Sequence, residues 1–194
     1  MSHNQDLIFI TGRQRSGTTV LRELFKKYGA LDADEIFHGV LNNKYRFYDY
    51  VYKRVLENKA LIYPVHHPRL FDEYIEYLRK ESANSPIVID VKYFSYQLLS
   101  ASYDVNCSKS FIVDYFKKKQ PYVIHVERRN KLRVYISEML SKRTGVWAVS
   151  NINEVPEGRF DITIDVMEMK AVLKKMLSDE NTVRSQLCGI EKLY

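Results

Sequence analysis

Short apolar runs alternate with amphipathic stretches along this 194-residue chain, and the alternation predicts an α/β fold. Three apolar, β-rich runs have the length of buried strands, namely Leu7–Thr11, Ile87–Val91 and Tyr122–Glu127. Apolar residues at helical spacing predict helices over Thr18–Tyr28, Leu41–Leu56, Arg69–Arg79, Ser108–Lys119, Asn130–Lys142 and Met167–Leu177. Asp32–Gly39 is expected to be irregular. Without an internal repeat or a linker, residues 1–194 are predicted to form a single domain, a parallel sheet flanked by helices.

Composition narrows the class of protein. Hydrophobic residues make up 45% of the chain, enough for a real core, and the net charge of +6 suits an anionic ligand, a nucleic acid or an acidic membrane. No segment has the interleaved basic and aromatic pattern of a nucleic-acid module, so no nucleic-acid partner is predicted. Cys107, Cys188 and the five histidines lack metal-ligand spacing, which predicts no metal site and free thiols. Met1–Asp6 has no signal-peptide pattern and no apolar run is long enough to span a membrane, so we expect a cytoplasmic protein of open oligomeric state.

A glycine-bounded loop follows the first predicted strand and opens a helix. The segment Gly12–Thr19 reads GRQRSGTT, and in this context backbone N–H groups at the helix start can hold a phosphate. Arg15 can add a charged hydrogen bond, and Thr18 and Thr19 can add hydroxyls. The two glycines have the spacing of the Walker A pattern, but its lysine position holds Thr18. That substitution argues against ATP or GTP as the reacting nucleotide.

Arg15–Thr19, after an apolar strand, resembles the 5′-phosphosulfate loop of the sulfotransferases that use 3′-phosphoadenosine-5′-phosphosulfate (PAPS). The resemblance implies a P-loop-like α/β fold. It also implies that Arg15 contacts the transferred group as a catalytic cation, while Ser16, Gly17, Thr18 and Thr19 bind the 5′-phosphate. No metal cofactor is implied, and the product would be the desulfated nucleotide PAP.

A second segment follows the third predicted strand. An Arg at a strand end and a Ser eight residues later, two turns into the next helix, can converge on one anion. Arg129, Asn130 and Ser137 are similar to the 3′-phosphate motif of the same family, which implies that Arg129 and Ser137 bind the 3′-phosphate of PAPS. The following segment, Ser141–Ala148, resembles bacterial, carbohydrate-directed members. A solvated basic helix start would explain the charges equally well, but two motifs in the family's order are more specific than one.

The transfer also needs a group that accepts the proton of the acceptor hydroxyl. Glu35-Ile-Phe resembles a glutamate-containing segment of the bacterial subfamily, so Glu35 is the first candidate base and His38 the second, against a plain acidic loop. Asp90 and Lys92 close the second strand and should face the ligand crevice, without an assigned role. The aromatic segment Tyr45–Tyr77 either contacts the acceptor or packs in the core.

The sequence therefore predicts a PAPS-dependent sulfotransferase that acts on a hydroxyl of a carbohydrate, glycolipid or small molecule. The alternatives are a P-loop nucleotide kinase and a non-catalytic protein that binds PAPS or another nucleotide. Bacterial relatives end in a further strand, which would begin near Glu191–Tyr194. The sheet could therefore lack its C-terminal strand and expose an edge.

Overall fold

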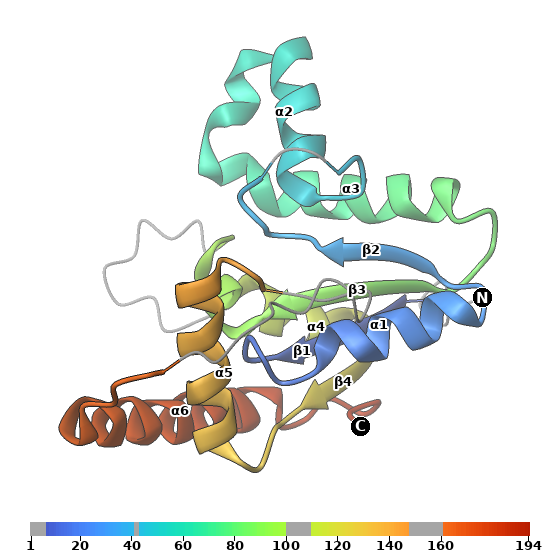
Figure 1. The fold of residues 1–194 in the computed structure, drawn as a ribbon. Helices are drawn as coiled ribbons and strands as arrows, with labels where there is room; N and C mark the ends of the chain where they lie inside the picture. The colour runs from blue at the N-terminus through green and yellow to red at the C-terminus, as the bar shows by residue number, and fades with distance from the viewer. Residues whose placement is uncertain (1–6, 41–42, 100–109, 148–160) are drawn as a thin grey trace.

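A four-stranded parallel sheet lies at the centre of the molecule (Figure 1). The computed structural model describes residues 7–40, 43–99, 110–147 and 161–194. The strands are β1 (Leu7–Gly12), β2 (Leu31–Glu35), β3 (Ile87–Lys92) and β4 (Tyr122–Val126), in the order β2-β3-β1-β4. The predicted α/β fold with a parallel, helix-flanked sheet is thus confirmed, and its arrangement is P-loop-like.

Helices connect the strands and cover the sheet. They are α1 (Thr18–Lys27), α2 (Phe47–Glu57), α3 (His67–Glu81), α4 (Phe111–Lys119), α5 (Lys131–Thr144) and α6 (Val166–Leu187), with short 3₁₀ turns η1 (Lys59–Ile62), η2 (Pro64–His66) and η3 (Tyr93–Gln97). On one face of the sheet Phe9 packs against Tyr115 and Phe116 of α4, and α1 lies across the other face (Figure 1). Both faces are therefore covered, which explains the continuous apolar runs of β1 and β3.

The expectation that Asp32–Gly39 is irregular is wrong in its first part, because β2 pairs with β3 there. Its sequence, LDADE, contains three carboxylates, so it lacks the apolar pattern of a strand. The register shifts between Asp32 and Glu35, and Asp34 adopts a φ of 63°. This irregularity at the sheet edge places acidic side chains where an ordinary strand would place apolar ones.

Three predicted helix limits also differ from the structure. The helix expected over Leu41–Leu56 begins at Phe47, and Leu41 and Ser108 lie outside the described residues. The last helix runs to Leu187, ten residues beyond the predicted end, because tertiary contacts continue along it. Val183 and Leu187 are buried, and the carboxylate of Glu180 pairs with Lys131.

Residues at the C-terminus pair with the outer edge of β4. The Val123 N–H donates to the Lys192 carbonyl, the His125 N–H to the Tyr194 carbonyl, and the Tyr194 N–H to the Val123 carbonyl, each at 2.9 Å. The edge that was expected to be open is therefore covered along this length. Among the described residues, no helix has both the length and the apolar character needed to cross a membrane.

Candidate functional site

A cavity of about 510 Å³ opens at the carboxyl end of the sheet, beside the start of α1. It is lined by Gln14, Arg15, Gly17, Thr18, Thr19, Val20, Arg22, Asp34, Glu35, Asp90, Lys92, Arg128, Val146 and Trp147. The lining therefore joins the glycine loop to the ends of β2 and β3 and to the residues that flank α5. Most of the residues predicted from the two motifs and from the base candidate converge on this one space.

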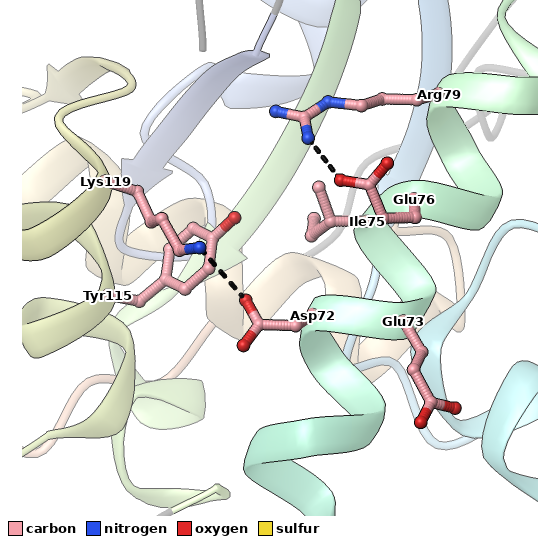
Figure 2. Close-up of a pocket in the computed structure, with 7 residues that line it drawn as sticks. All are labelled: Asp72, Glu73, Ile75, Glu76, Arg79, Tyr115 and Lys119. Atoms are coloured by element: carbon pink, nitrogen blue, oxygen red, sulfur yellow. Dashed lines mark hydrogen bonds and ion pairs between the residues drawn. The ribbon is translucent and has the colours of Figure 1, made fainter. Parts of the chain in front are cut away.

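A second cavity, of about 340 Å³, lies between α3 and α4 (Figure 2). Its charged side chains are engaged with one another: Asp72 pairs with Lys119 at 3.7 Å, and Glu76 accepts a hydrogen bond from Arg79. Figure 2 shows Glu73 directed away from these pairs. Because its charges are neutralised internally and it contains none of the motif residues, we take the first cavity as the candidate site.

The backbone of the loop explains its glycines. A Cβ at Gly12 would lie 2.9 Å from the Val126 carbonyl oxygen, so any larger residue would push β1 and β4 apart. Gly17 adopts a φ of 103°, which favours glycine, and Arg15 has a φ of 66°, unusual for a residue with a side chain. Gly17 precedes α1 and gives its N-terminus no side-chain cap, so first-turn N–H groups remain for a ligand.

Arg15 connects the two predicted motifs. Its Nε donates to the Ser137 hydroxyl at 2.9 Å, across 122 residues of sequence, and its guanidinium also donates to the Trp147 carbonyl. The Arg128 guanidinium donates to the Arg15 carbonyl at 3.2 Å and so buttresses the loop. The glycine loop and the start of α5 therefore form one polar surface.

Other predicted binding residues are placed differently. Arg129 is exposed and lies outside the cavity lining, which contains its neighbour Arg128 instead. The Asn130 side chain caps α5 by accepting a hydrogen bond from the Arg133 N–H at 2.9 Å. The Ser16 hydroxyl turns back and donates to the Arg13 carbonyl at 2.6 Å, which leaves its backbone N–H side of the loop as its contribution to the site.

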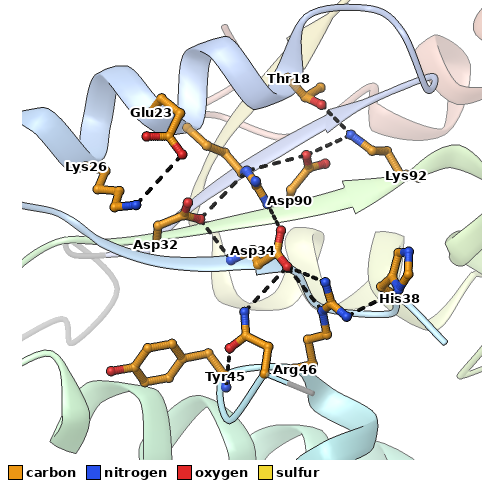
Figure 3. A network of polar contacts seen from close by, with 12 residues as sticks. Thr18, Glu23, Lys26, Asp32, Asp34, His38, Tyr45, Arg46, Asp90 and Lys92 are labelled. Carbon is orange, nitrogen blue, oxygen red and sulfur yellow. Dashed lines mark hydrogen bonds and ion pairs between the residues drawn. The ribbon is translucent and has the colours of Figure 1, made fainter. Parts of the chain in front are cut away.

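The opposite end of the cavity is acidic (Figure 3). Lys92 donates to the Thr18 hydroxyl and to Asp90 at 2.7 Å, and all three side chains are almost fully buried. One oxygen of Glu35 and one of Asp90 are buried without a hydrogen-bond partner among the described residues. Burial raises the pKa of Glu35, an effect that the Lys92 ammonium opposes and the Asp90 carboxylate reinforces. A desolvated carboxylate of this kind is a stronger base than an exposed one.

An ion-pair network surrounds this acidic end. Arg22 and Arg46 both bind Asp34, with Arg46 Nη2 at 2.7 Å from its carboxylate (Figure 3). Burial alone would raise the pKa of Asp34, but the two guanidiniums outweigh it and hold the pKa well below its usual range. His38 Nδ1 lies 3.3 Å from Arg46 Nη1 and accepts from the Val40 N–H, so His38 belongs to this network and not to the cavity lining.

The cavity thus has two ends of opposite character. At the loop end, Arg15 and Arg128 contact only neutral groups among the described residues, so their charges are available to an anion. At the other end, the carboxylates of Glu35 and Asp90 face the ammonium of Lys92. An anion at the first end and a proton donor at the second would suit this distribution of charge.

Sequence reasoning left out two parts of this site. Lys92 was placed at the crevice without a role, and Arg22 and Arg128 were not singled out at all. No local pattern marks them, because their positions depend on pairing between distant segments. The aromatic segment Tyr45–Tyr77 contributes to the core: Phe47, Phe71 and Tyr74 are fully buried, and none of its residues lines the cavity.

Known proteins give little guidance to the activity. The sequence matches no protein-family model and has no significant match among curated proteins. The fold is similar to a crystal structure of shikimate kinase from Bacteroides thetaiotaomicron, with a TM-score of 0.43 and 12% identity, over 97% of this chain and 85% of that one. A likeness at this level supports no argument about substrate or reaction.

Proposed function

We propose that this chain is a sulfotransferase that transfers a sulfuryl group from PAPS to a hydroxyl of a carbohydrate, glycolipid or small molecule. The observation that carries the proposal is the 2.9 Å contact between Arg15 Nε and the Ser137 hydroxyl. It brings together the segments that resemble the 5′-phosphosulfate loop and the 3′-phosphate motif. A nucleotide with phosphates at both ends of its ribose could therefore span them.

The donor would be held mainly by the positive end of the cavity. The N–H groups at the start of α1 and the Arg15 guanidinium would bind its 5′-phosphosulfate, together with the hydroxyls of Thr18 and Thr19. Ser137 and an arginine of the Arg128–Arg129 pair would bind the 3′-phosphate. Arg128 already lies at the cavity, and Arg129 would reach it by a side-chain rotation from its exposed position.

The donor supplies an electrophilic sulfur with a good leaving group, and the residues supply charge and a base. As the acceptor oxygen forms its bond to sulfur, the bond between sulfur and the 5′-phosphate oxygen breaks and its electron pair leaves with PAP. Glu35, desolvated and at the acidic end, takes the hydroxyl proton. Arg15 and Lys92 stabilise the negative charge that develops on the departing phosphate.

One observation favours a P-loop nucleotide kinase as a second candidate. The absence of a Walker lysine was the main sequence argument against it, yet Lys92 delivers an ammonium from β3 to the Thr18 hydroxyl, at the very position of that lysine in the loop. A cation is therefore available near a bound phosphate in either enzyme. The 3′-phosphate is the chemical feature that separates the two, because PAPS carries it and ATP does not.

A thermal-shift titration with PAP, PAPS, ATP and GTP tests the proposal without knowledge of the acceptor. We expect PAP and PAPS to raise the melting temperature strongly, and ATP and GTP to raise it little, with or without magnesium. A larger, magnesium-dependent shift with ATP or GTP would overturn the proposal and favour the kinase.

A further inference from the structure

A projecting tip of the molecule carries an unusual group of exposed apolar side chains. We define the tip as residues 52–69, from the middle of α2 through η1 and η2 to the start of α3. Its exposed apolar residues retain between 52% and 67% of their accessible surface and are Tyr52, Leu56, Ile62, Tyr63 and Val65. Figure 1 shows α2 standing away from the sheet, on the far side of α3.

These side chains are not needed to hold the tip in place. Val51 and Leu61 point inward and are buried in the main core, and α2 packs against η1. Each of them is followed in the chain by an outward residue, Tyr52 or Ile62, that stays exposed. The tip therefore has an inner apolar surface that folds it and an outer one that nothing in the described chain covers. Clustered exposed apolar residues on a soluble surface commonly mark an interaction site.

The charge of the tip is strongly positive. Its 18 residues contain four lysines and arginines and one glutamate, a net charge of +3 out of +6 for the whole chain. The cations are Lys53, Arg54, Lys59 and Arg69. Lys59 has no ion pair among the described residues, whereas Lys53 pairs with Asp49 and Arg69 with Glu73. The exposed apolar residues are thus surrounded by a basic rim.

We propose that this tip docks onto an anionic phospholipid bilayer. Leu56, Ile62 and Val65 would enter the boundary between headgroups and acyl chains, and Tyr52 and Tyr63 would sit at the headgroup level, where tyrosine is favoured. The basic rim would bind the anionic headgroups. The projecting position suits a broad, deformable surface, which a tip can reach without enclosing it. The proposal concerns a surface remote from the nucleotide cavity and does not depend on the reaction there.

Co-sedimentation with lipid vesicles tests the proposal. The full chain should bind phosphatidylcholine vesicles that contain phosphatidylserine and bind pure phosphatidylcholine vesicles much more weakly, with a loss of binding at high salt. The double variant Leu56→Ser/Ile62→Ser should bind about tenfold or more weakly, because two exposed apolar anchors are lost. Lys59→Glu should weaken binding only to the anionic vesicles.

The matched control is Met167→Ser/Leu177→Ser, which removes two equally exposed apolar side chains from α6. It should bind vesicles as the wild type does, and both double variants should keep the melting temperature of the wild type. Equal vesicle binding by the tip variant and the wild type, or no binding to anionic vesicles at all, would overturn the proposal. So would sedimentation-velocity data in which the wild type forms a dimer that the tip variant loses, because a second copy would then cover the tip.

Discussion

The Ser137 hydroxyl provides the sharpest test of how the cavity binds a nucleotide. In the structure it accepts a hydrogen bond from Arg15 Nε at 2.9 Å, and in the proposed complex it also donates to the 3′-phosphate. Ser137→Ala removes one hydrogen bond to a charged group while the backbone of α5 stays unchanged. A bond of this kind contributes roughly 1.5–3 kcal/mol, so the Kd for PAP should rise about ten- to hundredfold.

Isothermal titration with PAP and with AMP separates this effect from general damage. AMP has no 3′-phosphate, so its weaker affinity should change only by the small part that passes through Arg15. Ser141→Ala is the matched control, since Ser141 lies one turn later on α5 and its hydroxyl donates to the Ser137 carbonyl at 2.9 Å. We expect the Ser141 variant to keep the wild-type preference for PAP. Unchanged PAP affinity in Ser137→Ala, or an equal loss for PAP and AMP, would refute the assignment of the 3′-phosphate site.

Three further predictions concern individual side chains. Arg128→Ala should weaken PAP binding about ten- to hundredfold by calorimetry, and the same loss in Arg129→Ala alone would show that the exposed arginine swings in. Glu35→Gln should cut turnover roughly a hundredfold or more with unchanged PAP affinity, whereas His38→Ala should have a much smaller effect; near-normal turnover in Glu35→Gln would remove the base assignment. Lys92→Met should lower the free energy of unfolding by roughly 3–5 kcal/mol in a denaturant titration, because Asp90 is left as an unpaired buried charge, and a second change, Asp90→Asn, should restore most of it.

The raised pKa of Glu35 has a consequence for stability that requires no substrate. The folded state holds the Glu35 proton more tightly than the unfolded state, so this group costs stability once the pH exceeds its raised pKa and costs nothing below the ordinary value of 4.5. Glu35→Gln should therefore melt at a higher temperature than the wild type at pH 7, and the difference should disappear below pH 4.5. A difference that grew toward low pH would have the wrong sign for this account.

The parts of the fold that sequence reasoning found are those with a local signal. β1 and β3 are continuous apolar runs because both faces of the sheet are covered, and the glycine loop is marked by close backbone approach at Gly12 and positive φ at Gly17. β2 was missed because Asp32 and Asp34 replace the apolar residues of an ordinary strand. Their charges are stabilised by Arg22, which lies on another element, so no pattern within β2 reveals them.

The site shows the same division. Arg15, Thr18 and Ser137 were found because each occupies a fixed place in a short motif after a strand. Lys92 and Arg128 act across the sheet or across the loop, and only the pairing of β1 with β3 and β4 brings them to the cavity. Their importance follows from tertiary structure, which single-sequence patterns do not contain.

Transfer of a radioactive label tests the central claim most directly. The wild type and Glu35→Gln would be incubated with a panel of hydroxyl acceptors and either [³⁵S]PAPS or [γ-³²P]ATP, with and without a magnesium chelator. The account predicts that the wild type moves ³⁵S to at least one acceptor in the presence of the chelator, and that Glu35→Gln does so far more slowly. Magnesium-dependent transfer of ³²P, with no transfer of ³⁵S, would contradict the account and identify the chain as a kinase.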